Sequence, residues 1–407
     1  MAIAYAFVWL LPATRSRSES WFVSIAWAVT SAVILVPMLW ELTLRFGLLP
    51  DLLSAGILAL FVVAASAFGW KHNFQAVSWI VDSTASLAAL VLAIATRNPV
   101  PFIGALLIML IAGEVAAARG RGAQVRFFVA AAADLALFAA IWIYASPAAS
   151  RVEYRPVPTA LPLALAPALL FIHAVSATVQ TLLQRRAISV FETTQALIAL
   201  LLSIWTVLVF WSGPGAALLG GLCLIGSAAG YVLTFLRFDR THAARNYHVY
   251  AAGSFVLFLA GCFLSLHSGA LPFCLALFAI AVTASGARAS RRTLEMQGLI
   301  AFCAAGAASG LFVWELDTVA GRFPTAPAWI LLVAATAAIL AYAALVRFPD
   351  EHWWSQSLRL FSGFLAFTGA ASLILWVLVR MTAGATPAAE RLALIRTLTV
   401  CAFALAL

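Results

Sequence analysis

Long runs of apolar residues recur along almost the whole chain, and they limit its possible folds more than any other feature. A helix that crosses the roughly 30 Å hydrocarbon core of a bilayer needs about 20 such residues, because each adds about 1.5 Å. Hydrophobic residues make up 64% of the 407 positions and charged residues only 10%, whereas an ordinary soluble domain is about half apolar and a quarter charged. The sequence therefore predicts a polytopic integral membrane protein.

Apolar windows of suitable length predict about fourteen transmembrane spans. Each span is expected to be helical, because lipid offers no water to satisfy exposed backbone N–H and C=O groups. The predicted fold class is therefore all-α, a polytopic transmembrane helical bundle. The expected spans cover residues 22–43, 52–69, 75–96, 100–118, 126–145, 160–182, 190–212, 215–236, 248–267, 270–287, 295–314, 327–346, 357–379 and 388–407.

The two ends of the sequence depart from this pattern. A shorter apolar stretch, residues 2–11, precedes the first span and lacks the basic start and small-residue cleavage site of a signal peptide. The last span has no charged or aromatic anchor after it. We expect one membrane-embedded domain over residues 1–407, as a fragment of a longer chain. No soluble domain is expected, because no connection exceeds about twenty residues.

Arginine is concentrated in alternate connections between the spans. About sixteen of the 24 basic residues fall in one set of connections, such as AARGRGAQVR and GARASRR. Because short cytoplasmic loops retain basic residues, these connections are expected to face the cytoplasm of a bacterial inner membrane. The formal charge of +9 then indicates contact with anionic lipid headgroups. A nucleic-acid partner is not expected, because the charges are divided among short loops.

The same connections predict a regular order of helices. From each Arg-rich connection one span runs outward, a short turn with Gly or Pro follows, and the next span returns. These helical hairpins begin near Gln75, Arg126, Ser189, His248, Glu295 and Ser357. The pattern resembles bacterial families recorded only as predicted membrane proteins, which consist of tandem helical hairpins. The resemblance implies a multi-span helical protein and no specific activity.

Two glycine-containing stretches indicate close contact between helices. GSAAG, at Gly226 to Gly230, and GAASG, at Gly306 to Gly310, each place small residues four positions apart. Small residues let helix backbones approach where lipid provides no hydrophobic driving force. Packing within the chain is the favoured interpretation of both stretches.

Asp82, in the stretch WIVDSTASL, and Asp134 are carboxylates that lie deep within predicted spans. Each is about eight residues beyond the start of its span, and hence about 12 Å from the cytoplasmic edge. An ionised carboxylate in lipid costs at least about 2.5–3.5 kcal/mol, so each should face the protein interior, carry a proton or meet a donor. His173, in LLFIHAVSATVQ, is the histidine most deeply placed in a span. These three residues form the candidate intramembrane polar site.

Two interpretations of Asp82, Asp134 and His173 are open. They could line a polar pathway between helices that carries protons or binds a polar headgroup. Each could instead make one hydrogen bond between helices, worth about 0.6 kcal/mol, and only fix the packing. The sequence does not show whether the three side chains meet.

Glutamates near the ends of spans have simpler explanations. Glu114 precedes Arg119 by five residues, so its carboxylate is expected to reach the membrane interface. Glu192 and Glu295 fall in the first turns of spans, where the helix dipole favours an anion.

The tripeptide Trp-Glu-Leu occurs at the expected outer end of two spans, in WELTLRF and WELDTVAGRF. Glu41 and Arg45 are four residues apart on a helix and are expected to pair. Glu315 or Asp317 is expected to pair with Arg322 across a loop. Interfacial ion pairs are the favoured interpretation. The alternative is an outward-facing vestibule for a charged lipid-linked or sugar substrate.

Several kinds of site are disfavoured by what the sequence lacks. Lys71 is the only lysine, and no G-x-x-x-x-G-K-[ST] surrounds it, so a P-loop ATPase is excluded. The five cysteines form no C-x-x-C pair and the histidines no H-E-x-x-H, so neither a metal nor another cofactor is expected. An enzyme is the least favoured class, because no nucleophile and base are linked by spacing.

The sequence favours a carrier or flippase-like transporter of a small or lipid-linked molecule, because it combines many spans with acids inside them. A non-catalytic membrane scaffold, or an assembly subunit of a larger complex, is the alternative. Each feature also has a packing explanation. A water-accessible cavity lined by Asp82, Asp134 or His173 would favour transport, whereas a filled bundle in which these groups are paired would favour a scaffold.

Overall fold

The helices were located in a computed structural model, which describes residues 8, 21–72, 75–119, 126–147, 153–238, 244–267, 269–289, 291–320 and 329–347, with single positions beyond residue 350. Over these ranges every regular element is helical and no strand occurs, which confirms the all-α class. The elements are α2 (Trp21–Trp40), η2 (Glu41–Arg45), α3 (Asp51–His72), α4 (Gln75–Ala95), α5 (Pro99–Ala118), α6 (Arg126–Ala145), α7 (Ala160–Thr178), η4 (Val179–Leu183), α8 (Val190–Phe210), α9 (Pro214–Leu233), η5 (Thr234–Phe238), α10 (Ala244–Ser265), α11 (Ala270–Ala289), α12 (Arg292–Ser309), α13 (Leu311–Val319) and α14 (Trp329–Arg347). The η segments are π-helical turns that continue α2, α7 and α9.

Nine helices in the described part of the chain are long and apolar enough to cross a membrane. Two shorter apolar segments, Asp51–Ala67 and Leu331–Ala343, lie within α3 and α14. These helices have the character of a membrane protein. The total of about fourteen spans and their order as hairpins stay predictions. The expected spans 357–379 and 388–407 fall almost wholly outside the described residues.

The expected span 295–314 is wrong as a single helix. α12 ends at Ser309 and α13 begins at Leu311, and Gly310 between them has a φ of 77°. This left-handed conformation ends helices, and glycine adopts it without a steric penalty. Gly310 therefore ends a helix, and the interpretation of GAASG as a packing face is wrong for this glycine.

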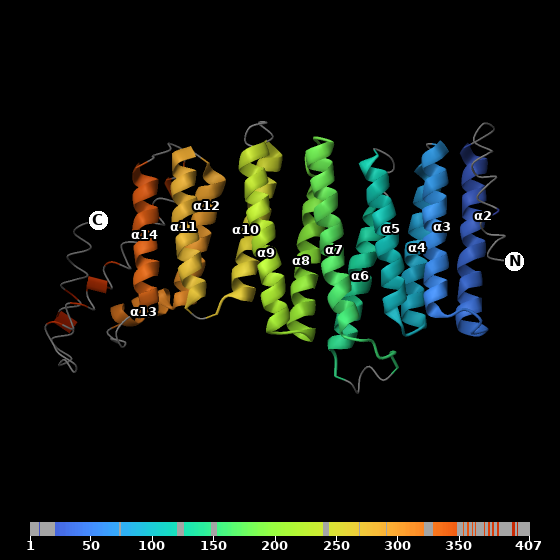
Figure 1. Cartoon of the computed structure of the whole chain (residues 1–407), viewed down its shortest axis with the longest axis horizontal. Coiled ribbons are helices and arrows are strands. Elements are labelled where there is room, and N and C mark those ends of the chain that lie inside the picture. The colour runs from blue at the N-terminus through green and yellow to red at the C-terminus, as the bar shows by residue number, and fades with distance from the viewer. Residues whose placement is uncertain are drawn as a thin grey trace. The chain divides into compact units, whose positions relative to one another are not determined.

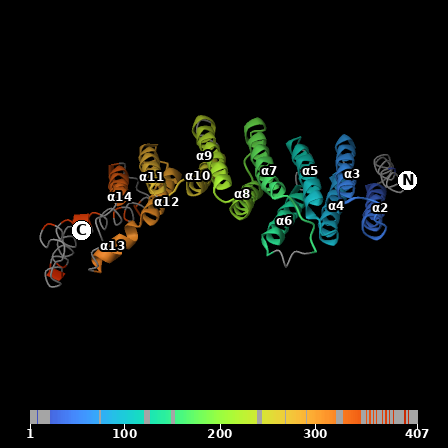
Figure 2. The same cartoon turned by 60° about the horizontal axis from the view of Figure 1, so that its bottom comes forward.

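The chain divides into two compact units, Met1–Ala216 and Ala217–Leu407. In the first unit α3 contacts α5, which contacts α7, while α2, α4, α6 and α8 form a second series of contacts. Figure 2 shows these two series as two rows of helices. In the second unit α11 packs against α12 and α14, and α12 also contacts α10 (Figure 1).

The interior of both units holds many alanines beside large side chains such as Phe102 and Phe302, and many large apolar side chains also face outward. Ala89 and Ala279 are fully buried, whereas Leu60, Leu87 and Phe171 are more than half exposed. Water would disfavour so many exposed large apolar side chains, because burial of apolar surface drives folding there. In lipid, close contact of small residues holds helices together. The surface is therefore suited to a hydrocarbon environment.

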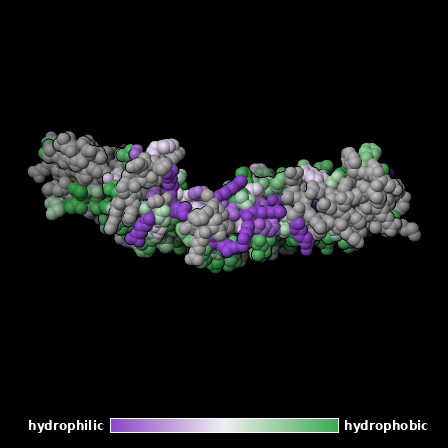
Figure 3. Space-filling model, turned by 90° about the horizontal axis from the view of Figure 1, so that it is seen from above, coloured by the Kyte–Doolittle hydropathy of each residue, from purple (hydrophilic) through white to green (hydrophobic). Residues whose placement is uncertain are grey.

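Arginine side chains mark one end of the helices in each unit. In the first unit, exposed Arg119 follows α5 and exposed Arg185 follows η4. In the second unit, exposed Arg237 ends η5 and exposed Arg288 lies in the last turn of α11. Figure 3 looks onto this end of the first-unit helices, where hydrophilic side chains gather between hydrophobic ones.

Candidate functional site

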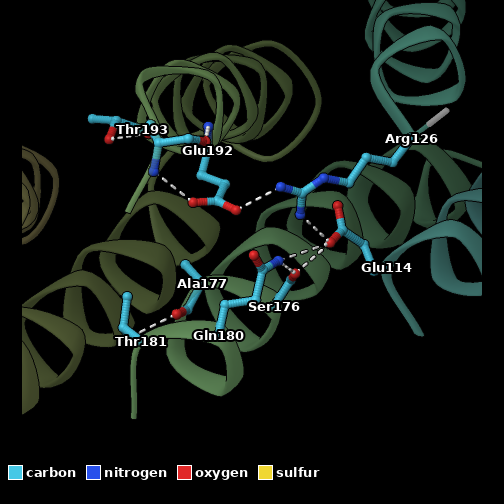
Figure 4. A network of polar contacts seen from close by, with 9 residues as sticks. Glu114, Arg126, Ser176, Ala177, Gln180, Thr181, Glu192 and Thr193 are labelled. Atoms are coloured by element: carbon cyan, nitrogen blue, oxygen red, sulfur yellow. Dashed lines mark hydrogen bonds and ion pairs between the residues drawn. The ribbon is translucent and has the colours of Figure 1, made fainter. Parts of the chain in front are cut away.

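The guanidinium of Arg126 lies between two carboxylates in the interior of the first unit. Its Nη1 is 2.8 Å from Oε2 of Glu114, and its Nη2 is 2.6 Å from Oε1 of Glu192. The side chain of Arg126 is only 5% exposed and those of the two glutamates 9%. The three residues come from α6, α5 and α8 (Figure 4). We call them, with Ser176 and Gln180, the charged cluster.

Glu192 has a second task besides its contact with Arg126. Ser189 is the N-cap of α8, and its hydroxyl accepts from the backbone N–H of Glu192 at 3.2 Å. In return the backbone N–H of Ser189 donates to Oε2 of Glu192 at 2.8 Å. This capping box fixes where α8 begins. Because it occupies Oε2, it also aims Oε1 at the guanidinium.

α7 and its π-helical end complete the charged cluster with neutral groups. The hydroxyl of Ser176 donates to Oε2 of Glu114. Gln180 lies beside it, with its amide 3.0 Å from Oγ of Ser176. When the Gln180 amide oxygen faces Arg126, it accepts from Nη1 at 2.6 Å while the amide nitrogen donates to Oε1 of Glu192 at 2.7 Å. That orientation satisfies both ends of the amide.

Two aromatic rings border the buried guanidinium. The Arg126 guanidinium carbon lies 5.8 Å from the ring centre of Phe127 and 5.9 Å from that of Phe191. The two rings contact each other, with centroids 4.1 Å apart. The face of an aromatic ring attracts a cation, so both rings help to stabilise Arg126 away from water.

The charged cluster holds more acid than base. Among the residues that the structure describes here, one guanidinium faces two carboxylates, which leaves one negative charge in excess. A buried net charge is expensive, because it loses the solvation that water provides. A multivalent metal site is not indicated, because no group of three or more His, Cys, Asp and Glu in the described ranges is arranged to hold a metal ion.

Asp82 and Asp134 lie in the interior of the first unit, outside the charged cluster. Asp82 on α4 is 4% exposed, and Ser66 on α3 is its hydrogen-bond partner. Asp134 on α6 is 9% exposed, and Gln195 on α8 is its partner. One oxygen of each carboxyl, Oδ1, has no hydrogen-bond partner.

His173 is the predicted site residue that lies nearest the charged cluster. It is 5% exposed, and the charged groups that act on its ring are Glu114 and Arg126. Its Nε2 has no hydrogen-bond partner. In the described part of the chain, no hydrogen bond or ion pair joins His173 to Asp82 or Asp134.

The predicted rim pairs are described only in part. Arg45 Nη1 lies 3.3 Å from Glu41 Oε2 on η2, and both side chains are well exposed. Asp317 lies on α13. The side chain of Glu315 and the whole of Arg322 lie outside the described residues.

The charged cluster was missed by reasoning from the sequence. Glu114 was expected at the membrane interface, but it is 7% exposed and paired with Arg126. Arg126 itself belongs to an Arg-rich stretch and was counted with the loop cations. The one available signal was the capping box of Ser189 and Glu192, which predicts a helix start but no partner for the second carboxylate oxygen.

A second group of polar contacts lies at the other ends of the first-unit helices, away from Arg119 and Arg185. Asp51 at the start of α3 accepts from Asn98 at 2.9 Å and lies 3.2 Å from Arg155. Arg97 lies 2.9 Å from Glu153. The cations of these pairs are well exposed, so each pair is screened by solvent and contributes little stability. Their main effect is to hold the 153–159 segment against the helix ends.

The chain matches no protein-family model, no curated protein and no solved structure. The class supported by fold and site together is a helical membrane protein with buried charged groups in its first unit.

Proposed function

We propose that the protein is a proton-linked carrier of a small or lipid-linked molecule. The observation that supports this function is the excess of acid in the charged cluster, where Glu114 and Glu192 share Arg126. A helical bundle with a purely structural role gains little stability from buried ion pairs, because the cost of desolvating the ions offsets most of their attraction. Ionisable groups inside membrane proteins therefore often serve ion pathways and proton relays.

The charged cluster also joins four helices of the first unit. Glu114 is on α5, Arg126 on α6 and Glu192 on α8, while Ser176 contributes from α7. A proton that neutralises one glutamate weakens its hold on the guanidinium and changes the balance of contacts between these helices. Proton binding and helix packing are thus linked through the same side chains.

The orientation belongs to the same proposal. We infer a bacterial inner membrane, with the Arg-rich connections in the cytoplasm and in contact with anionic headgroups. The charged cluster then lies at the cytoplasmic ends of its helices, because Arg126 and Glu192 fall in the first turns after such connections. Protons would reach it from that side.

The proposal is tested with the purified protein in vesicles of phosphatidylethanolamine and phosphatidylglycerol that contain the pH dye pyranine. A potassium diffusion potential drives protons inward, and the wild type should acidify the lumen faster than vesicles without protein. Glu192→Gln should reduce the rate to that of empty vesicles. It removes the excess charge, yet a glutamine at this position can still form the capping box.

The matched control is Glu41→Gln, which removes a carboxylate from an exposed pair on η2. Its rate should equal that of the wild type. Wild-type vesicles that acidify no faster than empty ones would contradict the carrier function, and so would an unchanged rate in Glu192→Gln.

A scaffold or assembly subunit is the second candidate, favoured by the tight contact of α9 and α10. A Cβ atom at Gly261 would lie 2.8 Å from the carbonyl oxygen of Gly220, so the two backbones are in direct contact and leave no space for a substrate between them. Absence of proton movement, together with a partner protein that remains bound in native mass spectrometry, would favour this function.

A further inference from the structure

Buried acids in the first unit fall into two groups that differ in their partners. Glu114 and Glu192 share the guanidinium of Arg126. Asp82 and Asp134 take part in no ion pair over the described ranges. An ionised carboxylate without a cation is costly in a membrane interior, whereas a protonated one is neutral. Among the described side chains, none provides the positive charge that would balance an ionised Asp82 or Asp134.

Oxygen atoms without hydrogen-bond partners lie at both aspartates, where an added positive charge would bind. Around Asp82, its Oδ1 and Oγ of Ser86 have no partner, and these residues are one turn apart on the same face of α4. Around Asp134, its Oδ1 and Oε1 of Gln195 have no partner. Both carboxyl Oδ1 atoms lack a donor, and a buried acceptor without a donor is unfavourable.

A proton fits these sites better than a metal cation does. Hard divalent cations such as Ca²⁺ and Mg²⁺ take about six or more oxygen ligands. In the described part of the chain, each aspartate has one further unpartnered oxygen beside it, on Ser86 or Gln195. A proton needs one oxygen, and a protonated Oδ1 becomes a donor that can reach a neighbouring acceptor.

Other titratable groups near the aspartates do not replace the proton. α4 packs against α2, α3, α5 and α6, and α6 packs also against α7 and α8. The charged or titratable residues described on these helices are Asp51, Glu114, Arg126, Tyr144, His173 and Glu192. None of them is paired with either aspartate. Lys71 and His72, in the last turn of α3, have side chains outside the described part.

We propose that Asp82 and Asp134 are proton-binding sites that exchange their protons with the solvent and supply the coupling ion of the carrier. Asp82 lies about 10 Å from the start of α4 and Asp134 about 12 Å from the start of α6, and these two helices are in contact. The two sites therefore lie at similar distances along neighbouring helices. The coupling role rests on the proposed function, whereas proton occupancy can be measured without it.

Infrared spectroscopy of the reconstituted protein tests this assignment, because a protonated carboxyl has a C=O stretch that an ionised carboxylate lacks. At mildly acid pH, Asp82→Asn and Asp134→Asn should each remove part of this band, and the double variant should remove both parts. In D₂O the same parts should shift in frequency as their protons exchange. Glu153→Gln, which changes an exposed acid, should leave the band unaltered.

Three results would overturn the assignment. The first is a band that neither aspartate substitution alters. The second is a band that keeps its position after long equilibration in D₂O, which identifies sealed structural acids. The third is loss of the band when sodium chloride is added at constant pH, which assigns the sites to a metal cation.

The infrared and vesicle experiments fail separately. Proton movement without these bands would leave the carrier function in place and remove the coupling sites. The bands without proton movement would confirm proton binding at the two aspartates and contradict the carrier function.

Discussion

Arg126 and Glu114 each lie at the end of a helix that disfavours their charge. Arg126 opens α6, where the helix dipole favours an anion, and Glu114 lies near the carboxyl end of α5, where it favours a cation. Their ion pair at 2.8 Å offsets both disadvantages. Glu192, in contrast, occupies the first turn of α8, where its charge is favoured. The cluster is therefore most dependent on Arg126.

Replacing Arg126 with glutamine should destabilise the protein strongly, because it leaves Glu114 and Glu192 buried without a cation. We expect a loss of about 3–5 kcal/mol in the free energy of unfolding. The measurement is a denaturant titration of the purified protein in detergent micelles.

The control for that variant is Arg45→Gln, which removes the cation of the exposed pair with Glu41. Solvent screens this pair, so the expected change is less than about 1 kcal/mol. Equal losses in the two variants would show that burial of the cluster contributes nothing.

The sequence revealed the acids of the site better than it revealed their partners. Asp82 and Asp134 stand out because their neighbours along the chain are apolar, and hydropathy alone gives their depth. Arg126 pairs with residues 12 and 66 positions away. Such pairs depend on which helices pack together, and the local sequence pattern does not indicate which helices these are.

Helix boundaries were predictable where the capping residues are close together in the sequence. The start of α8 follows from Ser189 and Glu192, since a capping box needs only residues three apart. The break at Gly310 was not predictable. In an apolar run, a glycine that allows close packing and a glycine that ends a helix look the same until the backbone conformation is known.

Gly261→Ala should weaken the contact between α9 and α10. The new Cβ atom would lie 2.6 Å from Cγ of Leu224 and 2.8 Å from the Gly220 carbonyl oxygen. Since the second contact is with backbone, the helices must separate, at an expected cost of about 1–3 kcal/mol. Thermal unfolding in detergent micelles measures this loss.

Gly253→Ala, on the same helix, is the matched control, because a Cβ atom there would have no neighbour within 4 Å. Alanine favours helix by up to about 1 kcal/mol over glycine, so this variant should be as stable as the wild type or more stable. A similar loss in both variants would contradict the close-contact explanation.

At the scale of the whole molecule, composition predicted the helical class and the apolar surface. It did so because lipid leaves only helices or closed barrels as spanning structures, and runs of about 20 apolar residues favour helices. Span counting was less successful, as α12 and α13 show. The division into two units was also not visible, because no change of composition occurs near Ala216.

Orientation in the membrane can be tested with single cysteines on opposite helix ends. Thr159→Cys and Ala187→Cys each change an exposed residue in a connection. If the Arg-rich ends are cytoplasmic, a membrane-impermeant maleimide should label only Thr159→Cys in intact cells and both variants after permeabilisation. The wild-type chain gives the background from its own cysteines. Labelling of Ala187→Cys alone in intact cells would reverse the orientation.

Glu192 divides its two carboxylate oxygens between the interior and the backbone. One oxygen faces Arg126, and the other receives the N–H of Ser189 at the end of the connection from η4. Loss of negative charge on this one side chain weakens both contacts together. The ion pair inside the bundle and the first turn of α8 therefore depend on the same side chain.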